Sequence, residues 1–138
     1  MNDIKLMNKA ADNIRILAAS MVEKAKSGHP GGAMGGADFV NVLFSEFLVY
    51  DPKNPAWEGR DRYFQDPGHM SPMLYSVLAL AGKFTIDELK EFRQWGSVTP
   101  GHPEVNVMRG IENTSGPLGQ GHTCLLYTSP SPRDMRRS

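Results

Sequence analysis

The feature that most constrains this chain is a long N-terminal stretch in which apolar residues recur at steps of three and four. Charged residues occupy the positions between them, which is the pattern of an amphipathic helix. Asp3 or Asn2 can accept the first free N–H groups, and Gly28 followed by Pro30 supplies a stop signal. The pattern therefore predicts a helix over residues 6–25.

Shorter patterns predict the elements that follow. The same periodicity returns over residues 38–48 and predicts a second helix, more buried than the first. The short aromatic run 62–65 predicts a strand. Residues 71–82, with Ser71 as the N-cap and Pro72 in the first turn, predict a third helix.

A capping box at 85–88 predicts a short fourth helix that ends near residue 92. From 96 to 121 the periodicity disappears, so this stretch is either a binding loop or part of an incomplete element.

The charge balance argues against two classes of partner. The chain has 15 Lys and Arg against 15 Asp and Glu, so it has no net field to hold a polyanion such as DNA. No apolar run approaches the roughly 20 residues of a membrane span. Residues 1–20 carry charges throughout, unlike a signal peptide, and the single Cys124 cannot form an internal disulfide. We expect a soluble cytoplasmic protein with no nucleic-acid or membrane partner.

The last residues differ in kind from the rest. Residues 124–138 have no sustained period, contain two Ser-Pro steps and end in a basic run, which is typical of an extended, solvated segment. The string CLLYTSPSPRD within them resembles the translation of a transposon-end adapter from a sequencing library. We therefore divide the chain into a natural part, 1–123, and a non-native or disordered tail, 124–138.

Every histidine follows a glycine, at Gly28-His29, Gly68-His69, Gly101-His102 and Gly121-His122. Glycine lets a loop turn sharply or approach a ligand, so the pattern favours a site on the rim of the protein. Three interpretations remain open. The histidines are ordinary loop residues, they bind zinc (although the short spacings of a ligand set are missing), or they hold a polar or anionic ligand.

Four motifs in order resemble the N-terminal motifs of the transketolase family, over essentially residues 5–123. They are Ser27-Gly28-His29-Pro30-Gly31, Asp61-Arg62-Tyr63-Phe64 leading to Gly68-His69, Thr99-Pro100-Gly101-His102-Pro103-Glu104, and Ser115-Gly116-Pro117-Leu118-Gly119-Gln120-Gly121. The related 1-deoxyxylulose-5-phosphate synthases share the cofactor but fit the first and third motifs less well.

The resemblance implies an α/β fold, of which this chain is the truncated start. The expected whole is a doubly wound thiamin-diphosphate-binding domain. The fragment itself should be mostly helical with few short strands, and should leave apolar faces uncovered. The implied reaction transfers a two-carbon ketol group from a ketose phosphate to an aldose phosphate, with thiamin diphosphate and Mg²⁺ or Ca²⁺ as cofactors. The full-length protein would be a homodimer that binds sugar phosphates.

The resemblance also implies roles for individual residues. His29 and His102 would be catalytic, His29 through the substrate hydroxyls and proton exchange, and His102 in the same cleft beside the cofactor. His69 would donate to the cofactor diphosphate. The Gly116 carbonyl would accept from the aminopyrimidine, and Pro117 and Leu118 would complete that contact, Leu118 between the two rings.

Departures from the family pattern limit what this chain can do. Asp66-Pro67 stands where many members have Ser-Asn, and His122 stands where many have an apolar residue, so His122 receives no role. The metal-binding segment of the family is missing, so no metal ligand is assigned and the chain alone is expected to be inactive. The alternatives are an N-terminal subunit of a split transketolase or other thiamin-diphosphate enzyme, and a non-catalytic binding module.

Overall fold

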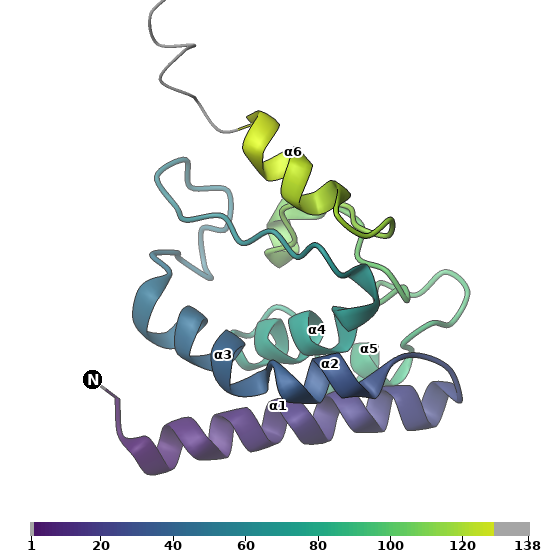
Figure 1. The fold of residues 1–138 in the computed structure, drawn as a ribbon. Coiled ribbons are helices and arrows are strands. Elements are labelled where there is room, and N and C mark those ends of the chain that lie inside the picture. The colour runs from purple at the N-terminus through teal and green to yellow at the C-terminus, as the bar shows by residue number, and fades with distance from the viewer. Residues whose placement is uncertain (1, 129–138) are drawn as a thin grey trace, which may run out of the picture.

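The computed structural model describes residues 2–128, and one long helix forms its base (Figure 1). This helix, α1 (Ile4–Ala25), confirms the helix predicted over 6–25. It begins where the Lys5 N–H donates to Asp3 Oδ1 at 2.9 Å. It ends at Lys26, which adopts a left-handed conformation with φ 50°, so the helix stops before Gly28 is reached.

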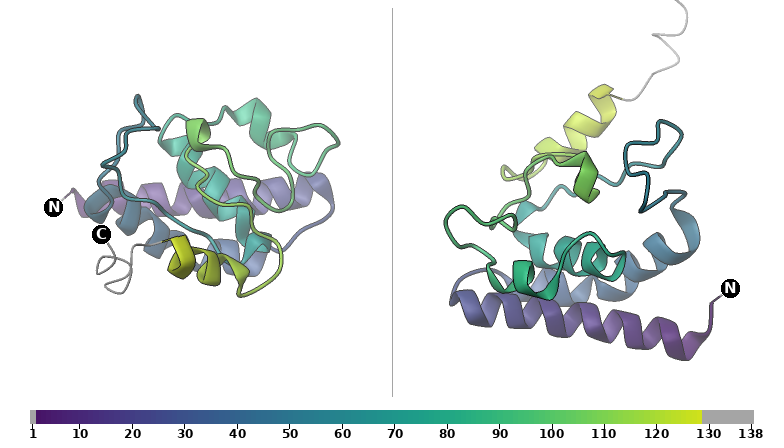
Figure 2. Two further views of the ribbon diagram at one scale, coloured as in Figure 1. Left: turned by 90° about the horizontal axis from the view of Figure 1, so that it is seen from above. Right: turned by 180° about the vertical axis from the view of Figure 1, so that it is seen from behind.

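The other elements are shorter and are arranged on one side of α1. α2, α3 and α4 pack directly against α1, whereas α6 lies at the opposite end of the molecule (Figure 2). In chain order they are α2 (Pro30–Gly35), α3 (Ala37–Val42), the π-helical η1 (Leu43–Phe47), the 3-10 turn η2 (Gly68–Met70), α4 (Ser71–Leu80), α5 (Ile86–Lys90), the 3-10 turn η3 (Val107–Arg109) and α6 (Gln120–Thr128).

The core lies between α1 and α4. Residues 71–78 of α4 are all buried, because α1 covers one side of the helix and later loops cover the other. Tyr75 is fully buried, packs against the rings of Phe84 and Phe92, and donates to the Pro100 carbonyl at 2.8 Å. Burial raises the pKa of the Tyr75 hydroxyl. α4 is thus a fixed support for the loops that meet at its N-terminal end.

The predicted second helix is present but divided. It consists of α3 followed by η1, where the Leu48 N–H donates to the Leu43 carbonyl at 2.9 Å, five residues back. Four of the 11 residues of α3 and η1 are buried, against four of the 22 residues of α1, so the second helix has the larger buried fraction, as predicted. Phe39 and Phe47 are nevertheless 65% and 69% exposed. The reason is that α3 and η1 lie at the edge of the assembly and are covered on one side only (Figure 1).

The strand predicted over 62–65 does not form. In place of a neighbouring strand, the side chain of Asn113 pairs with Gln65: its Oδ1 accepts from the Gln65 N–H and its Nδ2 donates to the Gln65 carbonyl, both at 3.2 Å. Within residues 2–128 the only β pairing is an isolated bridge between Asn106 and Ile111. The described chain is mostly helical, as predicted.

Two predicted helix starts had different outcomes. The capping box before α5 is confirmed, since Thr85 Oγ1 accepts from the Glu88 N–H at 3.2 Å and Glu88 Oε2 accepts from the Thr85 N–H at 2.8 Å. The N-cap prediction for Ser71 was wrong, because Met70 occupies that position. The Ser71 hydroxyl instead donates to the Gly101 carbonyl at 2.7 Å.

The predicted extended tail is partly wrong. Residues 124–128 belong to α6, and residues 129–138 lie outside the described part of the chain. Large apolar side chains are exposed, as expected for a fragment with uncovered faces. They include Ile4, Leu6, Ile16, Trp95, Leu118 and Leu126. Among the described residues, no helix combines the length and apolar character needed to cross a membrane.

Candidate functional site

Two of the glycine-histidine pairs meet beside the N-terminal end of α4. His29 is the residue before α2, and His69 lies in η2, immediately before α4. Their imidazole centroids are 5.0 Å apart, and the rings meet edge to face. His29 is exposed and His69 is half-buried, so both rings can be reached from solvent.

A third pair and the predicted aminopyrimidine segment approach the same point through Gly68. A Cβ atom on Gly68 would lie 2.9 Å from the Ser115 carbonyl oxygen and 3.0 Å from Cδ2 of His102. Cβ atoms in proteins essentially never approach other atoms closer than 3.0 Å, so only glycine allows this packing. The structure therefore brings His29, His69, His102 and the backbone at Ser115 together, although the sequence separates them widely.

The segment predicted to contact an aminopyrimidine is open on its outer side. A Cβ atom on Gly116 would meet nothing within 4 Å, Pro117 is exposed, and Leu118 is 68% exposed. Its inner side is fixed, because the Ser115 N–H donates to the Pro103 carbonyl at 3.1 Å. The Ser115 hydroxyl is buried, and within residues 2–128 it has no hydrogen-bond partner. A backbone segment that is held in place and carries a hydroxyl without a hydrogen-bond partner is suited to binding a polar ligand.

His122 is exposed, and its backbone belongs to a turn that Asp66 organises. The glycine turn, residues 119–122, directs three N–H groups at the Asp66 carboxylate: those of Gly119 at 2.9 Å, Gly121 at 2.8 Å and His122 at 3.3 Å. These hydrogen bonds, that of Gly119 above all, lower the pKa of Asp66. Asp66 thus ties the loop that carries His69 to the start of α6.

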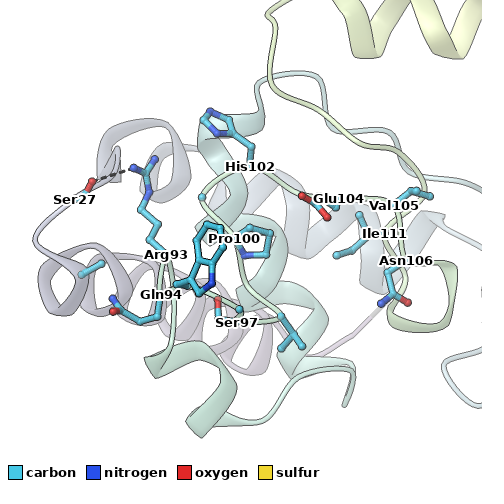
Figure 3. A pocket seen from close by; sticks show the side chains of 15 residues that line it. Ser27, Arg93, Gln94, Ser97, Pro100, His102, Glu104, Val105, Asn106 and Ile111 are labelled. Carbon is cyan, nitrogen blue, oxygen red and sulfur yellow. Dashed lines mark hydrogen bonds between the residues drawn. The ribbon is translucent and has the colours of Figure 1, made fainter.

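A hollow of about 820 Å³ opens beside His102, between the turn after α5 and the loop that carries His102 (Figure 3). Arg93, Trp95, Glu104 and Ile111 line it together with His102. The Arg93 guanidinium extends toward the first histidine loop, where Nη1 donates to Ser27 Oγ at 2.9 Å (Figure 3).

Sequence analysis missed both Asp66 and Arg93 as organising residues. Asp66 appeared only as a departure from the family pattern, and no sequence pattern singled out Arg93. Their partners lie more than 50 residues away in the chain, and no local pattern indicates contacts of that range.

The arrangement offers hydrogen bonds and proton exchange rather than metal ligands. Neutral imidazole has one donor and one acceptor nitrogen, which suits contact with hydroxyl and phosphate groups. Within residues 2–128, no three His, Cys, Asp or Glu side chains are grouped so that they could hold a metal ion.

Comparison with known proteins gives consistent results. The family model described as "Transketolase, thiamine diphosphate binding domain" matches residues 6–131. The chain is 54% identical over 117 residues to a transketolase from Buchnera aphidicola subsp. Baizongia pistaciae, which is 84% of this chain and 18% of that protein. It spans less than a fifth of the length of the curated relatives that it matches.

Solved structures agree. The transketolase of Campylobacter jejuni superposes with a TM-score of 0.82 at 48% identity, covering 87% of this chain and 19% of that one. The transketolase of Pichia stipitis in complex with sedoheptulose-7-phosphate superposes with a TM-score of 0.80 at 45% identity, covering 84% and 17%.

Proposed function

The chain belongs to the family of transketolase thiamine diphosphate binding domains, and we propose that residues 1–123 are the N-terminal part of that domain in a working transketolase. The proposed reaction of the whole enzyme is transfer of a two-carbon ketol group from a ketose phosphate to an aldose phosphate. The observation that supports it best is the meeting of three glycine-histidine loops with the Ser115–Gly116 backbone around Gly68.

The residues of this site fit the cofactor. Thiamin diphosphate, when bound, supplies the electron sink for breaking and forming a carbon–carbon bond. His69, half-buried beside His29, would donate to its diphosphate. The Gly116 carbonyl would accept from the aminopyrimidine, since the space around Gly116 is open. Pro117 would hold that carbonyl in place, and the exposed Leu118 side chain would pack between the cofactor rings.

His29 and His102 would serve the substrate. His29 is exposed next to His69, which suits binding of substrate hydroxyls and proton exchange at the reacting carbon. His102 is also exposed and lies against Gly68, so it would line the same cleft from the other side.

The metal and the surroundings of the enzyme are further parts of the proposal. A divalent ion, Mg²⁺ or Ca²⁺, would be held by residues outside 1–123, and without them the chain alone would not catalyse the reaction. We also propose a cytoplasmic homodimer that acts on sugar phosphates. The sugar phosphate bound to the Pichia stipitis enzyme supports the substrate class. No observation favours a split subunit, another thiamin-diphosphate enzyme or a non-catalytic module.

A chimeric enzyme tests this function. Residues 1–123 would replace the corresponding segment of transketolase 1 from Escherichia coli, to which this chain is 53% identical over 112 residues. We expect ketol transfer between a ketose phosphate and an aldose phosphate. In the chimera, His69→Ala should weaken thiamin diphosphate binding by about 10- to 150-fold, the effect of losing a hydrogen bond to a charged group.

His122→Ala is the matched control, because the exposed His122 side chain has no assigned role and its backbone N–H is retained. It should bind the cofactor like the parent. A folded chimera without ketol transfer would contradict the proposed function, and so would unchanged cofactor binding in His69→Ala.

A further inference from the structure

Arg93 has a backbone conformation that side-chain-bearing residues rarely adopt. Its φ angle is 62°, in the left-handed region. The Arg93 N–H donates to the Thr99 carbonyl at 3.0 Å, and the Thr99 hydroxyl in turn donates to the Glu88 carbonyl at 3.0 Å. These two hydrogen bonds connect the start of the turn after α5 to its end, and they hold the Arg93 backbone, from which the side chain extends, in one conformation.

On one side, the guanidinium reaches the loop that carries His29. Arg93 Nη1 donates to Ser27 Oγ at 2.9 Å, and Ser27 directly precedes Gly28-His29 (Figure 3). This hydrogen bond joins residues that are 66 positions apart in the chain. It fixes the entry to the first histidine loop relative to the turn after α5.

On the other side, the same guanidinium lies against the loop that carries His102. A Cβ atom on Gly101 would lie 2.8 Å from Arg93 Nε and 2.9 Å from Arg93 Cζ. Arg93 Nε is buried, and among residues 2–128 it has no hydrogen-bond partner. The guanidinium therefore packs directly against the Gly101 backbone, in the space that a side chain at 101 would take.

We propose that Arg93 is a positioning residue that sets the spacing between the His29 loop and the His102 loop. One planar guanidinium contacts both loops, and a lysine ammonium would lack the flat, multi-donor shape that makes both contacts at once. The importance of this spacing for substrate binding rests on the proposed function. The spacing itself is a property of the chain without any ligand.

Nuclear magnetic resonance of the ¹⁵N-labelled 138-residue chain tests the inference. Arg93→Ala should shift the imidazole and backbone signals of both His29 and His102, while signals from the first half of α1 stay in place. Ser27→Ala removes only one of the two contacts, so it should shift His29 and leave His102 unchanged. Arg93→Lys should restore at most one of the two histidines.

Arg15→Ala is the matched control for loss of a guanidinium, since Arg15 pairs with Asp12 and Asp38 instead of these loops. It should leave both histidines unchanged. Shifts of only one histidine in Arg93→Ala would overturn the inference, and so would full restoration of both by lysine. If Arg93→Ala unfolds the chain, Ser27→Ala decides: an unchanged His29 overturns the inference.

The two proposals fail separately. An inactive chimera together with coupled histidine shifts would reject the proposed function and keep the positioning role. An active chimera, together with an Arg93→Ala variant that shifts the signals of only one histidine, would keep the proposed function and reject the positioning role.

Discussion

Replacing Gly68 by alanine adds a single methyl group at the point where the histidine loops meet. Its Cβ atom would lie 2.9 Å from the Ser115 carbonyl oxygen, whereas ordinary van der Waals contact begins at 3.4 Å. The obstructing atom belongs to the backbone and cannot rotate away, so the Ser115 segment must retreat by about half an ångström. Overpacking of this kind costs about 1–3 kcal/mol.

Hydrogen exchange at the Ser115 amide measures that cost. This N–H donates to the Pro103 carbonyl at 3.1 Å and exchanges only when the segment opens. A penalty of 1–3 kcal/mol should raise its exchange rate about 5- to 150-fold in Gly68→Ala.

The matched control is Gly35→Ala, because a Cβ atom at this position in α2 would meet nothing within 4 Å. Alanine there should stabilise the helix by roughly 0.5–1 kcal/mol. The packing argument would be refuted if Ser115 exchange is unchanged in Gly68→Ala, or if both variants raise it equally.

The remaining predictions concern charged groups. The side chains of Arg60 and Glu112 are only 9% and 8% exposed and share hydrogen bonds of 2.6 and 2.9 Å. Glu112→Gln should therefore cost about 3–5 kcal/mol in local stability, seen as faster amide exchange around residue 60. Replacing both partners with apolar residues should recover most of the lost stability. The lowered pKa of Asp66 means that its stabilisation of the glycine turn is complete above the ordinary range of a carboxylate and is lost as pH falls through the lowered value. The protection of the turn amides, taken relative to their intrinsic exchange rate at each pH, should therefore fall only in acid, and Asp66→Asn should abolish this pH dependence. The Arg109 guanidinium lowers the pKa of Glu88 to about 2, so this ion pair should persist until the pH falls to about 2; a carboxyl titration that keeps that midpoint in Arg109→Gln would contradict the assignment.

Local patterns in the sequence predicted α1, α3, α4 and α5, but not α2 or α6. The periodicity of residues 6–25 fixes α1, since a buried stripe along one face needs no knowledge of its partner. The capping box of α5 was predictable for the same reason, because its two hydrogen bonds join residues three positions apart.

Failures occurred where a distant partner decides the outcome. Ser71 has the side chain of an N-cap, but its hydroxyl bonds to Gly101, 30 residues away. The candidate site follows the same rule. Gly-His spacing showed that the histidines are unusual, family resemblance assigned their roles, and only the fold shows that Gly68 is where the loops meet.

The pairing of Gln65 with Asn113 also bears on where a second copy of this chain can attach. Extended backbone with unused N–H and C=O groups is a template on which another molecule can add a strand. At Gln65 the Asn113 side chain already occupies both groups. A second molecule therefore cannot begin to add a β-strand at Gln65. Self-association is expected instead through exposed apolar helix surfaces, such as the one that carries Phe39 and Phe47.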